Sequence, residues 1–286
     1  MAGSTTTTLD TLLPQIVAEA MFVASERSIM RGLVRNFNLA AGQGKTVTVP
    51  IYPLQTAATV AEGDIVPNIE VTTGGATLTV STAAVRTLVT DLAVASAASN
   101  VVADLGRLFG EAIARKIDTD LTSQFYTFGA GEGDWTGDLD AASIFKAVAK
   151  LKAAAVPTDG LVCVVHPAVA YDLKSELTTA GNTPFTAGAY SEVSNEAMRM
   201  GYVGQLAGIP VYETSNIALK AGGQAGEYAG AVFHREALGL AMIGDIGIEV
   251  NRRPEYLGTD VIGYCHYGAG KIYDAYGRFL AFDSTI

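Results

Sequence analysis

The 286-residue sequence contains few cysteines, few histidines and few charged residues. Its two cysteines, Cys163 and Cys265, each lie in an apolar, strand-like run, so we expect two buried thiols and no disulfide framework. Three histidines leave a Ser-His-Asp site few general bases, and no Gly-x-Ser-x-Gly segment occurs. No apolar run approaches the roughly eighteen residues of a membrane helix. These absences argue against a serine hydrolase, a disulfide-rich secreted domain and a membrane protein.

Clustered positive charge is also scarce. The 19 lysines and arginines are scattered along the chain, with Arg252-Arg253 as the one pair of adjacent arginines, and the formal net charge is −10. Because phosphate binding requires clustered cations, the sequence argues against sequence-specific nucleic-acid binding and against an anionic membrane surface as a partner. The first ten residues lack the basic and apolar segments of a secretory signal, so we expect a protein of the reducing cytosol.

The apolar residues of the sequence recur with helical spacing in some segments and with strand spacing in others. Apolar residues recur every three or four positions over 99–126, which predicts a helix of roughly 42 Å that Ser99 can cap. An amphipathic helix is predicted over 9–35, and two more begin at Asp140 and Pro167, where His166 caps the second. Strands are predicted at 46–51, 77–81, 161–165, 209–212, 230–233, 246–251, 261–267 and 271–282. Helices and strands that do not alternate regularly indicate an α+β fold.

The segment 52–76 separates two predicted strands and is long for a loop of a compact domain. It contains several prolines and glycines, yet five aliphatic residues make it too apolar for a disordered linker. These are Val60, Ile65, Val66, Ile69 and Val71. The sequence offers no nearby surface for them, so we expect the loop to lie on a neighbouring subunit.

Three local motifs add to this order of elements. Val60-Ala61-Glu62-Gly63-Asp64-Ile65 falls in the long loop, and Glu111-Ala112-Ile113-Ala114-Arg115-Lys116-Ile117-Asp118 falls in the long helix. Gly204-Gln205-Leu206-Ala207-Gly208-Ile209-Pro210-Val211 leads into a strand. Together with the element order, these motifs resemble the Hong Kong 97-type major capsid proteins of tailed phages, and most of all the coat proteins of short-tailed phages.

The resemblance implies a Hong Kong 97-type fold in four parts. They are an N-terminal arm (1–44), an extended E-loop (45–90), a P-domain (91–136 and 254–286) containing the long spine helix, and an A-domain (137–253). It also implies a structural, non-enzymatic protein that forms the pentamers and hexamers of an icosahedral head enclosing double-stranded DNA. The implied locations are the virion and, during assembly, the host cytoplasm. Implied partners are a separate scaffolding protein, a portal and, in some heads, a decoration protein.

Eight residues are candidates for the assembly interface. They are Val60, Glu62, Asp64, Ile65, Val66 and Ile69 of the E-loop, together with Arg252 and Arg253 as cations for the loop's acids. Because an amphipathic helix is expected within about fifteen residues of Met1, we expect no cleaved N-terminal scaffolding segment. No lysine occurs between Thr46 and Val85, so we expect none of the lysine–asparagine cross-links that join some members of this family.

Three groups of residues could be interpreted as ligand sites, but a structural explanation fits each group better, so we expect no cofactor or metal. Gly44-Lys45-Thr46 lacks the earlier glycine of a phosphate-binding loop and precedes a strand instead of a helix. Zinc ligands would be Cys163, His166, Cys265 and His266, but residues 163 and 166 of a strand point to opposite faces. Glu132, Asp134, Asp138 and Asp140 lack the ligand spacing of a calcium loop.

Two other functions remain as alternatives. An encapsulin-type shell of a cellular nanocompartment would share the fold and would be favoured by a cargo enzyme encoded nearby. A cytosolic α/β enzyme would require a deep polar pocket in a monomer or small oligomer.

Overall fold

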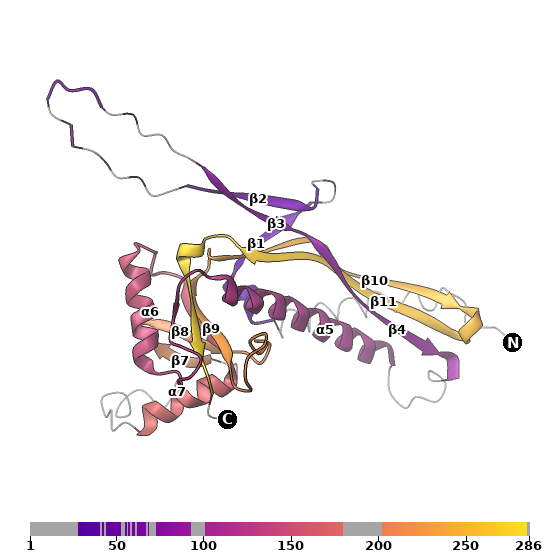
Figure 1. Cartoon of the computed structure of the whole chain (residues 1–286). Coiled ribbons are helices and arrows are strands. Elements are labelled where there is room, and N and C mark those ends of the chain that lie inside the picture. Colours follow the sequence, from indigo (N-terminus) through magenta and orange to yellow (C-terminus); the bar gives the residue numbers. More distant parts are fainter. Residues whose placement is uncertain are drawn as a thin grey trace.

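The computed structural model describes residues 28–40, 42, 44–52, 55, 57, 59, 60, 62–66, 68, 73–92, 101–179 and 202–284. This part of the chain forms an elongated sheet with a long helix along it, a second sheet with two helices, and a hairpin that projects from the body (Figure 1).

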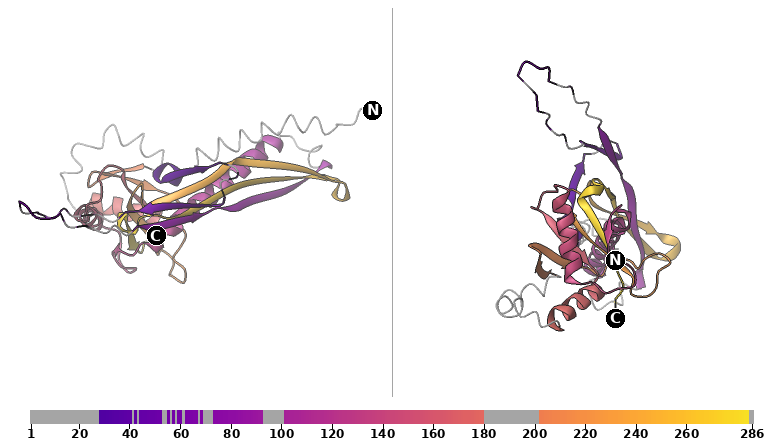
Figure 2. Two further views of the ribbon diagram at one scale, coloured as in Figure 1. Left: turned by 90° about the horizontal axis from the view of Figure 1, so that it is seen from above. Right: turned by 60° about the vertical axis from the view of Figure 1, so that its left-hand side comes forward.

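The elongated sheet has four strands. Their order is β1 (Arg35–Leu39), β10 (Leu238–Arg253), β11 (Gly258–Lys271) and β4 (Ser81–Thr90). β1 is parallel to β10, whereas β11 is antiparallel to both β10 and β4. Helix α5 (Val101–Ser123), continued by the 3-10 turn η1 (Gln124–Thr127), runs along this sheet (Figures 1 and 2). The β10–β11 ribbon and β4 end together at one extremity of the molecule, around the 3-10 turn η3 (Pro254–Tyr256).

The long helix is confirmed, and its apolar residues line one face as their spacing predicts. Phe109, Ile113, Ile117 and Leu121 are each at most 3% exposed. Phe109 packs closely on β11 because residue 263 is glycine, where a Cβ would lie 2.9 Å from the Phe109 ring. Ser99, its expected cap, lies outside the described residues.

The second sheet has six strands. Their order is β5 (Gly131–Glu132), β12 (Gly277–Phe282), β9 (Tyr228–His234), β6 (Leu161–Val165), β8 (Ile209–Glu213) and β7 (Tyr202–Leu206). Strand β6 is buried at every residue, as its uninterrupted apolar sequence predicts. Helices α6 (Ala141–Ala153) and α7 (Pro167–Thr179) belong to this half, and the 3-10 turn η4 (Asp274–Tyr276) leads into β12. One apolar cluster joins α6, α7 and the strands, including Ile144, Leu151 and Leu173.

Both predicted helix caps of this half are confirmed. The Asp140 carboxylate accepts a hydrogen bond from the Ser143 amide at 2.8 Å, as an N-cap does. The ring nitrogen Nδ1 of His166 accepts one from the Ala168 amide at 3.2 Å, at the start of α7.

The projecting hairpin consists of β2 (Thr46–Ile51) and β3 (Gly74–Thr79), paired antiparallel from Thr46↔Thr79 to Ile51↔Gly74. Lys45 leads directly into β2, so Gly44-Lys45-Thr46 opens a strand as predicted. The described loop residues beyond this ladder lie away from both sheets (Figure 1). The described loop residues therefore have no described part of their own chain beneath them.

Three predictions about elements differ from the structure. The strand expected over 271–282 is interrupted: β11 ends at Lys271, and β12 begins only at Gly277, after the turn η4. The described end of the expected helix 9–35 contains one short helix, α3 (Met30–Leu33), and residue 35 begins strand β1. Pairing with the distant β10 outweighs the local helical spacing there. Residues 1–27 lie outside the described residues.

The strands also divide between the sheets differently from the expected domain bounds. Strand β10, expected in the A-domain, belongs to the elongated sheet with β11. Strand β12, expected in the P-domain, pairs with β9 of the six-stranded sheet. Both differences arise from long-range pairing, which local periodicity does not reveal.

Candidate assembly interface

The apolar residues of the projecting loop are exposed in the single chain. Ile65 is 92% exposed, Val66 74%, Tyr52 65% and Val60 36%. Large aliphatic side chains exposed together on a projecting segment usually mark a contact with another molecule. Ile69 and Val71, also assigned to the loop's apolar set, lie outside the described residues.

Glu62 and Asp64 flank the turn at Gly63, whose φ of +89° favours glycine. Both acids are exposed, and neither forms an ion pair within the part of the chain that the structure describes. Their charges are therefore available to a partner.

Arg252 and Arg253 lie at the far end of the β10–β11 ribbon and are paired within their own chain. The guanidinium of Arg252 makes a two-bond contact with the Asp91 carboxylate, with distances of 2.5 and 2.6 Å. Arg253 Nε donates to Asp260 Oδ2 at 3.0 Å, and Arg86 donates to the same carboxylate at 2.7 Å. The structure thus brings these cations to Asp91 and Asp260, and their expected pairing with Glu62 and Asp64 stays a prediction.

The carboxylate of Asp260 is the centre of this ion-pair group. Its side chain is 1% exposed, and the hydrogen bond from Arg86 lowers its pKa, against the effect of burial and with help from Arg253. The bond between Arg252 and Asp91 likewise lowers the pKa of Asp91. These contacts hold together β4, β10 and β11 where the three strands end.

A second exposed apolar surface lies beside these ion pairs, and sequence reasoning missed it. We call it the tip patch: Leu88, Leu92, Tyr256 and Leu257, which are 37%, 78%, 60% and 70% exposed. The backbone amide of Asp91 donates to the carbonyl of Leu257 at 2.9 Å, which joins the end of β4 to the ribbon turn. The available signal was a tyrosine and a leucine within a turn, where small polar residues are usual.

Leu257 has an unusual backbone conformation at the turn. Its φ of +44° lies in the left-handed region, which glycine adopts freely and leucine adopts at a cost of about 1–2 kcal/mol. A strained and exposed leucine at the end of a projecting ribbon contributes little to its own subunit. This observation favours a role in contact with another molecule.

The residues considered as metal ligands have other surroundings. Cys163 lies in the six-stranded sheet and Cys265 in the four-stranded one, both buried. Glu132 is buried and bonded to Lys146, Lys150 and Arg278. Within residues 28–92, 101–179 and 202–284 as described, no cluster of three metal-ligating side chains occurs. Among the described helices, none is long and apolar enough to cross a membrane.

A family model described as phage capsid protein matches residues 74–280, which is more than half of the chain. No curated protein matches the sequence significantly.

Solved phage capsid structures share the fold. The capsid of cyanophage P-SCSP1u aligns with a TM-score of 0.69 at 16% identity, covering 90% of this chain and 89% of that chain. A chain of Mycobacterium phage Che8 aligns with a TM-score of 0.67 at 20% identity, covering 88% and 90%. The capsid of a native GTA particle aligns with a TM-score of 0.63 at 14% identity, covering 90% and 91%.

Proposed function

The chain belongs to the phage capsid protein family and is a structural major capsid protein of the virion, and from this premise we propose that it forms the pentamers and hexamers of an icosahedral head enclosing double-stranded DNA. Its α+β fold is of the Hong Kong 97 type, as the sequence predicts. The family match and these structural relatives do not favour the encapsulin alternative.

One observation carries the proposal: the projecting loop exposes aliphatic residues that its own subunit does not cover. Ile65 and Val66, which are 92% and 74% exposed, would each contribute about 1.5–3 kcal/mol if fully buried on a neighbour, and Val60, at 36%, would contribute less. Each subunit of a closed shell would make this contact, so a modest gain per contact is repeated throughout the shell. The proposed interface also includes Glu62, Asp64, Ile69, Arg252 and Arg253. If the two acids pair with the two arginines, reversing the charges of either group should weaken the shell, and reversing both groups together should partly restore it.

In this proposal the two sheets belong to two domains that take different places in the shell. We assign the six-stranded sheet with α6 and α7 to the A-domain around the capsomer axis. The four-stranded sheet with α5 forms the P-domain, and its tip patch reaches other subunits. A separate scaffolding protein and a portal complete assembly in the host cytoplasm, and a decoration protein is a further partner in this proposal.

Electron microscopy of the purified full chain tests the proposed function directly. Closed shells or rings of five and six subunits are the expected result. A uniform monomer at every protein concentration, in the presence of crowding agents and scaffolding protein, would contradict it.

Replacing Tyr256 by serine is expected to reduce shell yield at least tenfold without lowering the subunit's melting temperature. Tyr256 is 60% exposed in the subunit, so its loss removes more contact area where subunits meet than within the subunit. A loss of about 1.4 kcal/mol of binding free energy per contact corresponds to a tenfold weaker affinity. The measurements are light scattering during assembly and a thermal melt.

Tyr171→Ser is the matched control for this variant. Tyr171 is similarly exposed, at 55%, but lies on α7 of the six-stranded half. Equal losses of assembly from both tyrosines would remove the special role of the tip patch.

The shell is expected to hold together without covalent cross-links. Between Thr46 and Val85 the loop has no lysine to react with a neighbour's asparagine. Particles boiled in detergent should therefore give a single band near the 29.7 kDa subunit mass. A ladder of cross-linked multimers would contradict this prediction.

A further inference from the structure

Two histidines lie at opposite ends of the fully buried strand β6. His166 follows the last residue of β6, and His234, on the neighbouring strand β9, pairs with the first residue of β6. The imidazole of His166 stacks on Tyr228 with 3.6 Å between the ring centroids, and that of His234 lies nearly perpendicular to Tyr276 at 5.8 Å. Both imidazoles are thus packed into the six-stranded half.

Each of these rings accepts a backbone N–H at Nδ1. The amide of Ala168, in the first turn of α7, donates to His166 at 3.2 Å, and the amide of Glu236 donates to His234 at 3.3 Å. A ring nitrogen that accepts such a bond carries no hydrogen, so both imidazoles are neutral, with their proton on Nε2. Nε2 of His234 then donates to the carbonyl of Asp159 at 2.7 Å.

The bonds of His234 hold the turn before β6 against the end of β9. Beside the ring, the amide of Arg235 donates to the carbonyl of Gly160 at 3.2 Å. A Cβ on Gly160 would lie 3.4 Å from Nε2 of His234, so the ring packs closely against this turn. At the other end of β6, His166 fixes the first turn of α7, whose Leu173 packs in the apolar cluster of this half. The two rings therefore connect β6 to the segments on either side of it.

Protonation would break both Nδ1 bonds, because a hydrogen on Nδ1 turns the acceptor into a donor that faces a backbone N–H. At His166 it would also place a positive charge at the N-terminus of α7, where the helix dipole disfavours it. Burial disfavours the charged ring as well and lowers the pKa of His166. Geometry and burial therefore both favour the neutral ring at the start of α7.

The charged side chains on the elements packed around the two rings have other surroundings. The ion pairs among them are Glu213–Lys174, Glu227–Lys220, Glu236–Arg35 and Asp274–Lys271. The guanidinium of Arg235 donates to the carbonyl of Val34, while Asp159 is exposed and Asp172 of α7 is buried. The Nδ1 bonds are therefore the contacts that a proton on these rings changes most.

We propose that His166 and His234 form an acid-sensitive clamp, which holds the two ends of β6 while both rings are neutral and releases them when the rings are protonated. A histidine whose pKa is lowered by folding stabilises the folded state above the unfolded-state pKa of about 6.5, and this effect is lost as the pH falls through the folded-state value. For His166 the release therefore occurs below about pH 6.5. The clamp acts within one subunit, so it is tested without assembly.

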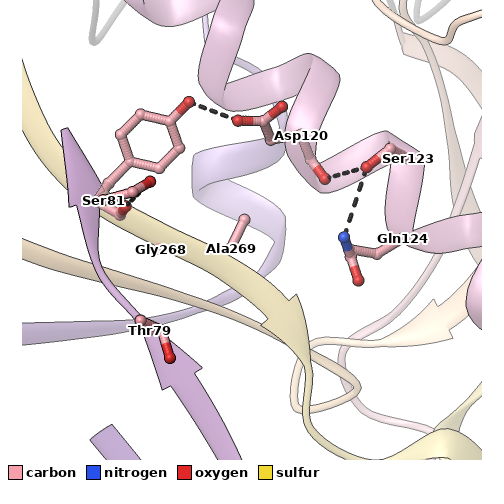
Figure 3. Close-up of a pocket in the computed structure, with 8 residues that line it drawn as sticks. Thr79, Ser81, Asp120, Ser123, Gln124, Gly268 and Ala269 are labelled. Atoms are coloured by element: carbon pink, nitrogen blue, oxygen red, sulfur yellow. Dashed lines mark hydrogen bonds between the residues drawn. The ribbon is translucent and has the colours of Figure 1, made fainter. Parts of the chain in front are cut away.

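The elongated sheet is not expected to respond to the same change of pH. Nδ1 of its histidine, His266, lies 2.8 Å from the Thr82 hydroxyl, which accepts as well as donates, so protonation leaves this bond in place. Figure 3 shows the Asp120 carboxylate on α5, to which the hydroxyl of Tyr267 on β11 donates at 2.7 Å. Burial raises the pKa of Tyr267, so this donor keeps its proton. The elongated sheet is thus an internal reference for the clamp.

Amide hydrogen exchange of the unassembled full chain tests the clamp, measured from about pH 7.5 to about pH 4.5 and corrected for the intrinsic exchange rate. Amides 168–171, at the start of α7, and 234–237, at the end of β9, should lose about fivefold in protection, as expected for a lost helix cap. Amides 82–90 of β4 and 259–267 of β11 should keep their protection. Unchanged protection of the first two segments over this range would overturn the clamp.

Asparagine variants separate the hydrogen bond from its titration, because the side-chain oxygen of asparagine accepts an amide bond at every pH. His166→Asn should keep the protection of 168–171 in acid and leave the loss at 234–237, and His234→Asn should do the reverse. His266→Asn is the matched control and should keep the wild-type response. If His166→Asn and His234→Asn fold at neutral pH and still lose protection in acid as the wild type does, other groups carry the response and the clamp is excluded.

Discussion

Deleting the loop between β2 and β3 is expected to leave a folded subunit that no longer assembles into shells. The change replaces residues 52–73 by a short Gly-Ser turn that joins Ile51 to Gly74, the outermost pair of the β2–β3 ladder. The described apolar residues of the loop are exposed, so the subunit's cores lose nothing by their removal. Assembly loses the contact of three or more aliphatic side chains, worth about 1.5–3 kcal/mol per subunit for three of them at about a third of full burial.

Sedimentation velocity tests the loss of assembly, and thermal melts test whether the subunit stays folded. The deletion should sediment as a monomer or capsomer and keep a cooperative transition within a few degrees of the full chain. Ile65→Ser with Val66→Ser is the matched variant, since it keeps the loop's length and should weaken assembly less than the deletion does. Shells of normal appearance from the deletion would remove the loop's role. An unfolded product would place the loop in the subunit core.

Replacing Glu132 by alanine is expected to lower the free energy of unfolding of the subunit by about 3 kcal/mol. The Glu132 side chain is 2% exposed and contacts three cations: Lys150 at 2.5 Å, Lys146 at 3.3 Å and Arg278 at 3.4 Å. Without this carboxylate, three positive charges repel one another where β5, α6 and β12 meet. Denaturant unfolding of the unassembled subunit measures the loss.

Glu213→Ala is the matched control for Glu132→Ala. Glu213 pairs with a single lysine, Lys174, and both side chains are partly exposed, so its loss should cost at most about 1 kcal/mol. A similar loss from both variants would show that burial of Glu132 among three cations adds nothing.

The contribution of Glu132 should also depend on pH. Burial alone would raise the pKa of this carboxyl group, but the bonds from Lys150 and Lys146 outweigh burial and lower its pKa. A lowered folded-state pKa stabilises the protein above the unfolded-state value and loses this effect as the pH falls through the folded-state value. The difference in unfolding free energy between wild type and Glu132→Gln should therefore be largest near neutral pH and shrink below about pH 4. A difference that is constant from pH 7 to pH 3 would exclude a role for the charge.

The elements with strong local periods were predictable from the sequence. Helix α5 repeats its apolar residues over more than six turns, and β6 is an uninterrupted apolar run, so each signal exceeds its alternatives. Strand β1 gave a weak signal because Asn36 and Asn38 alternate with half-buried residues at the edge of a sheet. Its partner β10 lies some two hundred residues later in the sequence, as the pair Arg35↔Gly239 illustrates. No local pattern contains that information.

The same limit applies to the candidate interface. The apolar character of the projecting loop was visible in the sequence, because five aliphatic residues interrupt a stretch rich in proline and glycine. The tip patch left only a weak signal, a tyrosine and a leucine within a turn, since the exposure of Tyr256 and Leu257 depends on where the ribbon ends in space. The partners of Arg252 and Arg253 were also missed. Asp91 precedes Arg252 by 161 residues, and a charge pair at that separation leaves no periodic trace.

The order of strands in the elongated sheet has a consequence for the growing polypeptide on the ribosome. Strands β1 and β4 are made early, but their partners β10 and β11 end only at Arg253 and Lys271. Until those residues leave the exit tunnel, β4 has no neighbour to pair with in the elongated sheet. A nascent chain therefore cannot present the β2–β3 hairpin to other subunits in its native position. Synthesis as far as Lys271 precedes competence to associate into a coat, and until then β4 is an unpaired strand that other chains could pair with.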